Sequence, residues 1–294
     1  LVNYKPNLLA RSLRGKSGNI IGLVVPGVIS YPFFSYIINH IEDSIIDAGY
    51  NMMLGIDKDD PAREEKFIED MMSMNVSGII FSRVSDRSKA LHILEKTDIP
   101  IVILDRILAN EGIPNVVVDN PKAGRLAAAH LYNLGHRSVG CITGPMEIAL
   151  SRDRLRGFKG HFAENGITIP DNHIIEGDFK FESGIKAVEH FKRQDMPCTA
   201  IWAQNDFMAL GIMRGFYNEG IRIPDAISLL GMDDIDVGTM VSPSLTTLRQ
   251  PYQLMCKKAV ELILLEKEKG KDNLEQKQIV LEPELVVRES TRKL

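Results

Sequence analysis

The chain has few of the residues that mark several protein classes. It contains three cysteines, one tryptophan and 6% aromatic residues in a total of 294. Cys141, Cys198 and Cys256 are far apart and belong to no CxxC pair or Cys/His cluster. Neither a disulfide framework nor a zinc site is therefore expected, and low cysteine use favours the reducing cytosol as the compartment.

Signals for membranes and for free nucleic-acid binding are also missing. No run reaches the ~18 apolar residues that a membrane span needs, and the first residues lack the apolar segment of a secretory signal. The net charge of -4 is unlike that of a protein that coats DNA. Residue 1 is not Met, so we expect the chain to start inside a longer protein.

Motifs for common enzyme chemistry are absent. No GxGxxG follows a strand-like run, and there is no P-loop, GxSxG or HExxH. The seven histidines are scattered, and His130 and His136 are interpreted as structural. We therefore predict no catalytic residue, no metal and no cofactor, and a protein that is not an enzyme.

Strand-like apolar runs alternate with helical patterns along the chain. The strand-like runs are 20–25, 51–56, 78–81, 100–104, 115–118, 138–144, 173–177, 199–203 and 226–231. They are continuously apolar, as expected of strands covered on both faces. Asp60 and Pro61 are a typical N-cap and first helical residue. The pattern predicts an α/β protein with parallel, doubly wound sheets.

The alternation occurs in two series, each of ~100 residues, which is the usual scale of a domain. A helix over 252–268 and a strand over 278–287 follow the polar segment 242–252 and are assigned to the first and second lobes. The predicted division is a linker over 1–17, a first lobe of 18–118 plus 249–277, and a second lobe of 119–248 plus 278–294. Several segments then cross between two Rossmann-like lobes, and we expect a ligand cleft between them.

Polar and aromatic residues follow the predicted strands, where ligands bind in open α/β sheets. They are Tyr31, Phe33 and Phe34 after the first strand, Asp105 and Arg106 after 100–104, Phe179 after 173–177, Asn205 after 199–203, and Asp233 after 226–231, with Arg154 near the start of a helix over 151–165. Carboxylates accept pairs of hydroxyl hydrogens, and the arginine fork bridges neighbouring oxygens. Aromatic rings pack on the C–H faces of a sugar. The set therefore predicts a small sugar as ligand.

Structural roles remain open for some of these residues and their neighbours. Asp206 and Asp153 are alternatively helix N-caps. Arg152 and Arg156 are alternatively solvated. Phe34, Phe158 and Trp202 are alternatively core residues, and Asp234 beside Asp233 is expected to cap or brace.

Residues 1–16 contain Lys5, Arg11, Arg14 and Lys16 and no acid. Pro6 is able to start a short helix that includes Leu13. Such a helix is marginal alone, but its basic residues suit phosphates and an exposed leucine suits a minor-groove base step. A frayed linker is the alternative.

The motifs NYKPNLLARSLRGKSGNIIGLVVP, YPFF, ILDR, VDN, LGHRSVGCITGP, RLRGF, GDF, AQNDFMALG, GMDDI and SPSLTTLRQP occur in this order along the chain. Together they closely resemble the lactose/galactose-repressor (LacI/GalR) family over essentially the whole chain. The resemblance implies a periplasmic-binding-protein-like fold, a hinge helix and a homodimer whose hinge helices enter the operator minor groove. It implies a helix-turn-helix before this segment, with residues 1–3 as its end.

The resemblance also implies roles for particular residues. Pro6 and Asn7 match the start of the hinge helix, Leu13 looks like the minor-groove wedge, and Arg11 and Arg14 are expected DNA contacts. Phe33, Phe34, Asp105, Arg106, Arg154, Phe179, Asn205, Asp233 and Gln250 fall on the ligand positions of ribose-repressor relatives and periplasmic ribose-type binding proteins. Tyr31 departs from that pattern, which has asparagine there, so ribose itself is in doubt as the ligand.

The expected function is thus effector sensing in a cytoplasmic, DNA-binding transcription regulator, a repressor, in which a small sugar or sugar phosphate controls operator binding. Three rivals remain open: a sugar-binding protein of an uptake system, a Rossmann enzyme acting on a sugar, and a regulator with a protein corepressor. A strongly apolar exposed face of the first lobe favours the last.

Overall fold

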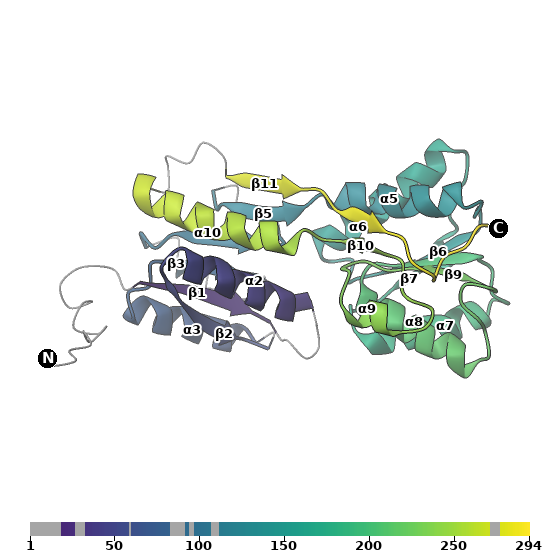
Figure 1. Cartoon of the computed structure of the whole chain (residues 1–294), viewed down its shortest axis with the longest axis horizontal. Helices are drawn as coiled ribbons and strands as arrows, with labels where there is room; N and C mark the ends of the chain where they lie inside the picture. Colours follow the sequence, from purple (N-terminus) through teal and green to yellow (C-terminus); the bar gives the residue numbers. More distant parts are fainter. Residues whose placement is uncertain are drawn as a thin grey trace, which may run out of the picture. The chain divides into compact units, whose positions relative to one another are not determined.

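The computed structural model describes residues 19–26, 33–58, 60–82, 92–93, 97–106, 112–270 and 277–294. The chain forms two compact units, each an α/β layer structure (Figure 1). Unit 1 holds the described residues of Leu1–Ile29, Phe34–Val117 and Tyr252–Val280, and unit 2 holds those of Ser30–Phe33, Val118–Pro251 and Leu281–Leu294. The chain therefore passes from one unit to the other several times, and the α/β class predicted from the alternating pattern is confirmed.

Unit 1 is built on a six-stranded sheet in the order β11-β5-β4-β3-β1-β2. Its strands are β1 (Ile20–Val25), β2 (Asn51–Ile56), β3 (Gly78–Phe81), β4 (Ile101–Leu104), β5 (Asn115–Val118) and β11 (Gln278–Leu281). The pairs from β2 through β1, β3 and β4 to β5 are all parallel. Strands β3 and β4 are buried at every position, as their continuous apolar sequence predicts.

Three described helices belong to unit 1: α2 (Phe33–Asp47), α3 (Pro61–Ser73) and α10 (Tyr252–Lys269). Helix α3 starts as predicted, because the Asp60 carboxylate accepts a hydrogen bond from the Ala62 N–H at 3.0 Å and Pro61 occupies the first turn. Helix α10 packs on the sheet where Gly78 leaves room for the Ile263 side chain. No helix in the described ranges is long and apolar enough to cross a membrane.

Unit 2 contains a parallel four-stranded sheet in the order β7-β6-β8-β9. The strands are β6 (Val139–Thr143), β7 (Ile174–Glu176), β8 (Ala200–Ala203) and β9 (Ser228–Leu230). The helices are α5 (Asn120–Asn133), α6 (Ala149–Glu164), α7 (Phe181–Lys192), α8 (Asp206–Asn218) and the short α9 (Val237–Met240), with a 3-10 turn over Asp171–His173.

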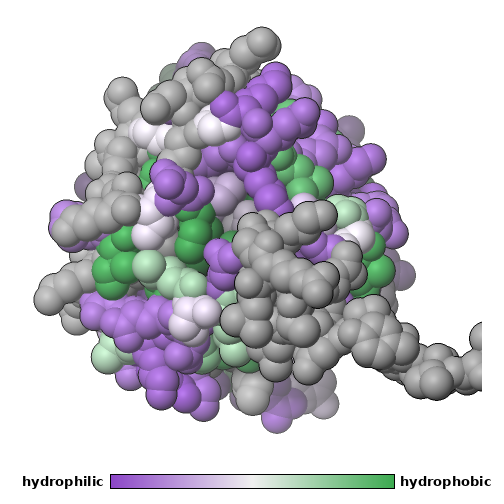
Figure 2. Space-filling model, turned by 90° about the vertical axis from the view of Figure 1, so that its left-hand side faces the viewer, coloured by the Kyte–Doolittle hydropathy of each residue, from purple (hydrophilic) through white to green (hydrophobic). Residues whose placement is uncertain are grey.

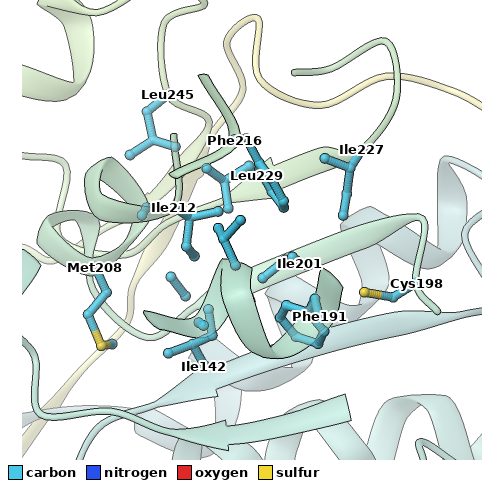
Figure 3. Packing of buried hydrophobic residues seen from close by; sticks show 14 residues of the cluster. Ile142, Phe191, Cys198, Ile201, Met208, Ile212, Phe216, Ile227, Leu229 and Leu245 are labelled. Atoms are coloured by element: carbon cyan, nitrogen blue, oxygen red, sulfur yellow. The ribbon is translucent and has the colours of Figure 1, made fainter. Parts of the chain in front are cut away.

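A hydrophobic core between the sheet and helices α7 and α8 stabilises unit 2 (Figure 3). Phe191, Ile201 and Phe216 are fully buried within it. Trp202 and Phe158 are also fully buried, with ring centroids 5.0 Å apart, so the alternative core role of both residues is the one that the structure supports.

Glycines allow two pairs of helices in unit 2 to pack backbone against backbone. A Cβ atom on Gly157 of α6 would lie 2.0 Å from the Pro121 carbonyl oxygen of α5. A Cβ on Gly211 of α8 would lie 2.0 Å from the carbonyl oxygen of Phe181 in α7. These contacts fix where α6 and α8, and hence the residues near their N-termini, lie against the rest of the unit.

The predicted single strand over 278–287 is wrong in detail. It is divided into β11, which belongs to the six-stranded sheet of unit 1, and β12 (Glu284–Val286), which pairs with β10 (Thr247–Arg249) in an antiparallel two-stranded sheet. Pro283 stands between the two strands and has no N–H for a ladder hydrogen bond. Strand β10 lies within the segment that its polar sequence marked as a connection.

Candidate functional site

Three loops of unit 2 lie at one edge of its sheet. Strands β6, β8 and β9 are parallel, with β8 between the other two, so the segments that follow them meet at the same end. These segments begin with Gly144, Gln204 and Gly231. Gln204 joins two of the neighbouring elements, because its side-chain oxygen accepts from the Gly144 N–H at 3.2 Å and its amide nitrogen donates to the Ser151 carbonyl at 3.1 Å.

Arg154 is held in a fixed orientation at this edge. It lies in α6 and is only 3% exposed. Its Nε donates to Asn120 Oδ1 and its Nη1 to the Gln204 carbonyl oxygen, both at 2.8 Å. An arginine fork that is oriented in advance loses little entropy when it binds an oxygen-rich ligand. The structure thus places Arg154 beside the end of β8.

Phe179 lies in the segment between β7 and α7, and contacts with Asn205 and Gly144 hold its conformation. Its φ is 64°, which a bulky residue rarely adopts. Asn205 Nδ2 donates to the Phe179 carbonyl at 2.9 Å, while Asn205 Oδ1 caps helix α8 by accepting from the Met208 N–H. The ring packs on Gly144, where an added Cβ would lie 1.8 Å from it. Phe179 therefore presents a half-buried aromatic surface at the sheet edge.

Asp233 and Gln250 form a buried polar pair. Gln250 Nε2 donates to Asp233 Oδ1 at 2.7 Å, and the two residues are 2% and 5% exposed, Gln250 being the more buried. Gln250 Oε1 and Ser151 Oγ are buried without a hydrogen-bond partner within the described part of the chain. Buried polar atoms of this kind normally require a partner, which a ligand is able to supply. Ser151 was not among the predicted ligand residues.

The candidate residues of unit 1 lie at the carboxyl end of its own sheet. Asp105 and Arg106 directly follow β4, and Asp105 has a φ of 65°. Phe34, the first residue of unit 1 in this segment, lies at the start of α2 and is 7% exposed, and Phe33 directly before it is the last residue of a short segment assigned to unit 2. This is the strand end at which the α/β arrangement places ligands.

Comparisons with known proteins agree with the architecture. A periplasmic binding protein-like domain model matches residues 128–291, which is more than half of the chain. The transcriptional repressor PurR of Photobacterium profundum is 34% identical over 100% of this chain and 87% of its own length. The transcriptional regulator DegA of Bacillus subtilis is 34% identical over 99% of this chain and 86% of its own length. The chain belongs to the LacI/GalR family of transcription regulators.

Solved structures of LacI-family proteins share the whole fold. The lac repressor dimer bound to operator and an anti-inducer superimposes with a TM-score of 0.86 at 26% identity, over 99% of this chain and 100% of that one. A LacI-family regulator from Enterococcus faecium with bound ribose gives 0.81 at 26% identity, over 94% and 99%. The predicted family is therefore confirmed, and the chain is the effector-sensing part of a regulator and not the binding protein of an uptake system. The relatives are regulators and not enzymes.

Some of the predicted functional residues lie outside the described residues. They are Tyr31 of the ligand set and the DNA-contact set of Pro6, Asn7, Arg11, Leu13 and Arg14. Their roles stay predictions.

The structure also shows the surroundings of other polar residues that Sequence analysis considered. His136 is 1% exposed and contacts Thr199 Oγ1 at 2.9 Å and Ser228 Oγ at 3.1 Å, and burial lowers its pKa. Arg152 is a surface residue that donates to the carbonyls of Met146 and Glu147. No group of three or more His, Cys, Asp or Glu suited to a metal occurs among the residues that the structure describes.

Asp206 is not the N-cap of α8, which was the alternative role considered for it, because Asn205 caps that helix. Asp206 is fully buried instead. Its Oδ1 accepts from Thr247 Oγ1 at 2.6 Å and its Oδ2 from the Ile235 N–H at 3.0 Å. Burial raises the pKa of Asp206 to about 6, against the hydrogen bonds, which lower it. A sequence pattern does not separate a cap from a buried acceptor, since both follow a strand and open a helix.

This pKa predicts a specific pH dependence of stability. Because the pKa is raised in the folded state, the contribution of Asp206 is fully present below its ordinary pKa of 3.8 and is lost as the pH rises through about 6. We expect the free energy of unfolding of the wild type, minus that of Asp206→Asn, to fall by about 2–3 kcal/mol between pH 4 and pH 7. Urea unfolding of both proteins at each pH measures this free-energy difference. A difference that does not vary with pH would contradict the raised pKa of Asp206.

Proposed function

We propose that this LacI-family chain binds a small sugar or sugar derivative as its effector, and that effector binding controls the affinity of the protein for operator DNA. The proposal rests on three side chains that lie near the carboxyl ends of the strands in unit 2. Arg154, Phe179 and Asp233 offer a fixed guanidinium, an aromatic face and a buried carboxylate. These are the groups that hydroxyls and the C–H face of a sugar ring require.

Particular roles follow from the chemistry of each residue. Asp233 accepts hydroxyl hydrogens, Arg154 donates to ring or hydroxyl oxygens, and Phe179 packs on the ring. Gln250 Oε1 is a further acceptor for a hydroxyl, and Asn205 keeps Phe179 in place. Tyr31, Phe33, Phe34, Asp105 and Arg106 remain predicted contacts of the same effector.

The relatives support the proposal at the level of ligand class. The Enterococcus faecium regulator holds ribose, and the lac repressor was solved as a dimer on its operator. We accordingly propose that this protein acts as a cytoplasmic homodimer on operator DNA, with contacts from the hinge residues Pro6, Asn7, Arg11, Leu13 and Arg14. Coupling of effector and operator must be reciprocal and amounts to about 1–3 kcal/mol in such systems.

A strongly apolar exposed face on unit 1 would favour a protein corepressor as the effector. On the face seen in Figure 2, the described hydrophobic residues lie in patches among hydrophilic ones.

A thermal-shift screen of pentoses, hexoses and their phosphates tests the proposed function. We expect a subset of these sugars to raise the melting temperature of the wild type. Asp233→Asn should weaken the binding of the best sugar by about 10–100-fold, because it removes a charge-assisted acceptor. Asp225→Asn, which changes an exposed carboxylate that pairs with Arg222 before the start of β9, is the matched control and should bind like the wild type. No shift with any sugar would overturn the proposal.

A further inference from the structure

The loop that carries Asp233 has an unusual backbone. Loop 231–235, from Gly231 to Ile235, contains two successive non-glycine residues with positive φ, at 129° for Asp233 and 62° for Asp234. Such conformations cost of order 1–3 kcal/mol each and persist where the surroundings impose them. Something in unit 2 must therefore hold this loop.

The first anchor of loop 231–235 is the carboxylate of Asp206. It accepts from the Ile235 N–H at 3.0 Å, and the Asp206 N–H donates to the Met232 carbonyl at 2.6 Å. A Cβ on Gly231 would lie 2.1 Å from Asp206 Oδ1, so the carboxylate packs directly on the loop. The side chain thus contacts the loop at its start and at its end.

The second anchor holds Asp234 through two arginines. Arg249 Nε donates to Asp234 Oδ2 at 2.7 Å, and Arg288 pairs with Asp234 Oδ1. The Arg249 side chain is 48% exposed, so its pair contributes little, whereas the side chains of Arg288 and Asp234 are only 16% and 10% exposed. The N–H groups of Gly231 and Asp233 also donate to the carbonyls of Thr246 and Leu248. Asp206 differs from these restraints because its fully buried carboxylate contacts both ends of the loop.

Thr247 completes the arrangement of Asp206. Its hydroxyl donates to Asp206 Oδ1 at 2.6 Å, and it lies in β10. Beyond β10 the chain runs to Pro251, where this part of unit 2 ends, and Tyr252 begins the next part of unit 1. One carboxylate therefore joins the loop that carries Asp233 to the chain segment that leads into unit 1.

We propose that Asp206 is a positioning residue of the effector site: through Ile235 and Thr247 it holds loop 231–235 so that Asp233 is oriented for the effector, which Asp206 itself does not touch. This inference rests on the proposed function, because Asp206 affects effector binding only by orienting Asp233.

The test uses a matched pair of variants in the full chain. Thr247→Val removes the hydroxyl that donates to Asp206 and keeps the shape of the side chain. Thr246→Val makes the same change at an equally buried neighbour whose hydroxyl contacts Arg288 N and Thr291 instead. Asp206→Ala removes the anchor. Asp206→Asn retains it, because the amide accepts from Ile235 N–H and donates to Thr247 Oγ1.

Hydrogen exchange without any sugar gives the first readout. We expect the peptide that contains the Ile235 amide to exchange at least about tenfold faster in Asp206→Ala and Thr247→Val than in Thr246→Val, because its partner is lost or displaced. Asp206→Asn should exchange like the wild type. Equal exchange in all variants would overturn the inference, whatever the effector proves to be.

Sugar affinity gives the second readout, with D-ribose or the panel sugar that stabilises the wild type most. We expect Thr247→Val and Asp206→Ala to bind it about tenfold more weakly or worse, and Asp206→Asn to restore affinity to within about twofold. Equal weakening in Thr246→Val and Thr247→Val would show a general loss of structure and sink the positioning role. If no sugar binds the wild type, the proposed function fails, and the exchange result alone decides whether Asp206 anchors the loop.

Discussion

Arg154→Ala is expected to lower the affinity for the effector sugar by more than about 100-fold. The guanidinium is buried and oriented in advance by Asn120 and the Gln204 carbonyl, so its loss removes a charged donor to the sugar. A hydrogen bond to a charged group contributes about 1.5–3 kcal/mol, and the arginine fork is able to make more than one such bond. Isothermal titration calorimetry measures the affinity directly.

Arg152→Ala is the control for this prediction. Arg152 lies two residues away in the same helix, is exposed, and donates to the carbonyls of Met146 and Glu147. This variant should bind the sugar within about twofold of the wild type, since the Arg152 side chain is exposed and takes no part in the buried contacts of Arg154 with Asn120 and Gln204. An Arg154→Ala protein that stays folded and binds as tightly as Arg152→Ala would show that the ligand residues are wrongly assigned.

Gly157→Ala is expected to lower the free energy of unfolding of unit 2 by about 3 kcal/mol or more, at the upper end of overpacking effects. The added methyl would lie 2.0 Å from the Pro121 carbonyl oxygen, a backbone atom that a rotamer change does not move. Helix α6 would have to shift away from α5 and carry Arg154 with it. Urea unfolding followed by the fluorescence of Trp202, the one tryptophan of the chain, measures the loss.

Gly160→Ala, in the same helix, is expected to raise the free energy of unfolding. The atom nearest to a Cβ added at Gly160 would be Arg125 Nη1, at 3.8 Å, so the methyl group fits without a clash. Replacement of an unobstructed helical glycine should stabilise by about 0.5–1 kcal/mol. Equal effects at Gly157 and Gly160 would contradict the close packing of α5 on α6.

Much of the fold could be predicted from local patterns in the sequence. The strands of both parallel sheets are continuous apolar runs such as 20–25 and 199–203, because helices cover both faces. Asp60 and Pro61 start α3 as local chemistry requires. Strand β10 was missed because three residues inside a polar connection carry no periodicity, and their partner, β12, lies far along the chain. The break at Pro283 was missed because the apolar residues on its two sides look like one strand.

The candidate site is predictable to a similar degree. The rule that ligands lie beyond the carboxyl ends of parallel strands selects Asp105, Phe179, Asn205 and Asp233 without a structure, whereas Gln250 came only from the family resemblance. The roles of Ser151 and Thr247 depend on contacts between residues distant in sequence. Asp206 shows the limit clearly, since its buried hydrogen bonds to Ile235 and Thr247 leave no mark in the local sequence.

A crystal structure of the chain grown with the sugar that stabilises it most tests the central claim most directly. The account predicts sugar hydroxyls within hydrogen-bond distance of Asp233 and Arg154, with one face of the ring packed on Phe179. A sugar bound elsewhere on the protein, with these three residues in contact only with solvent, would contradict the account.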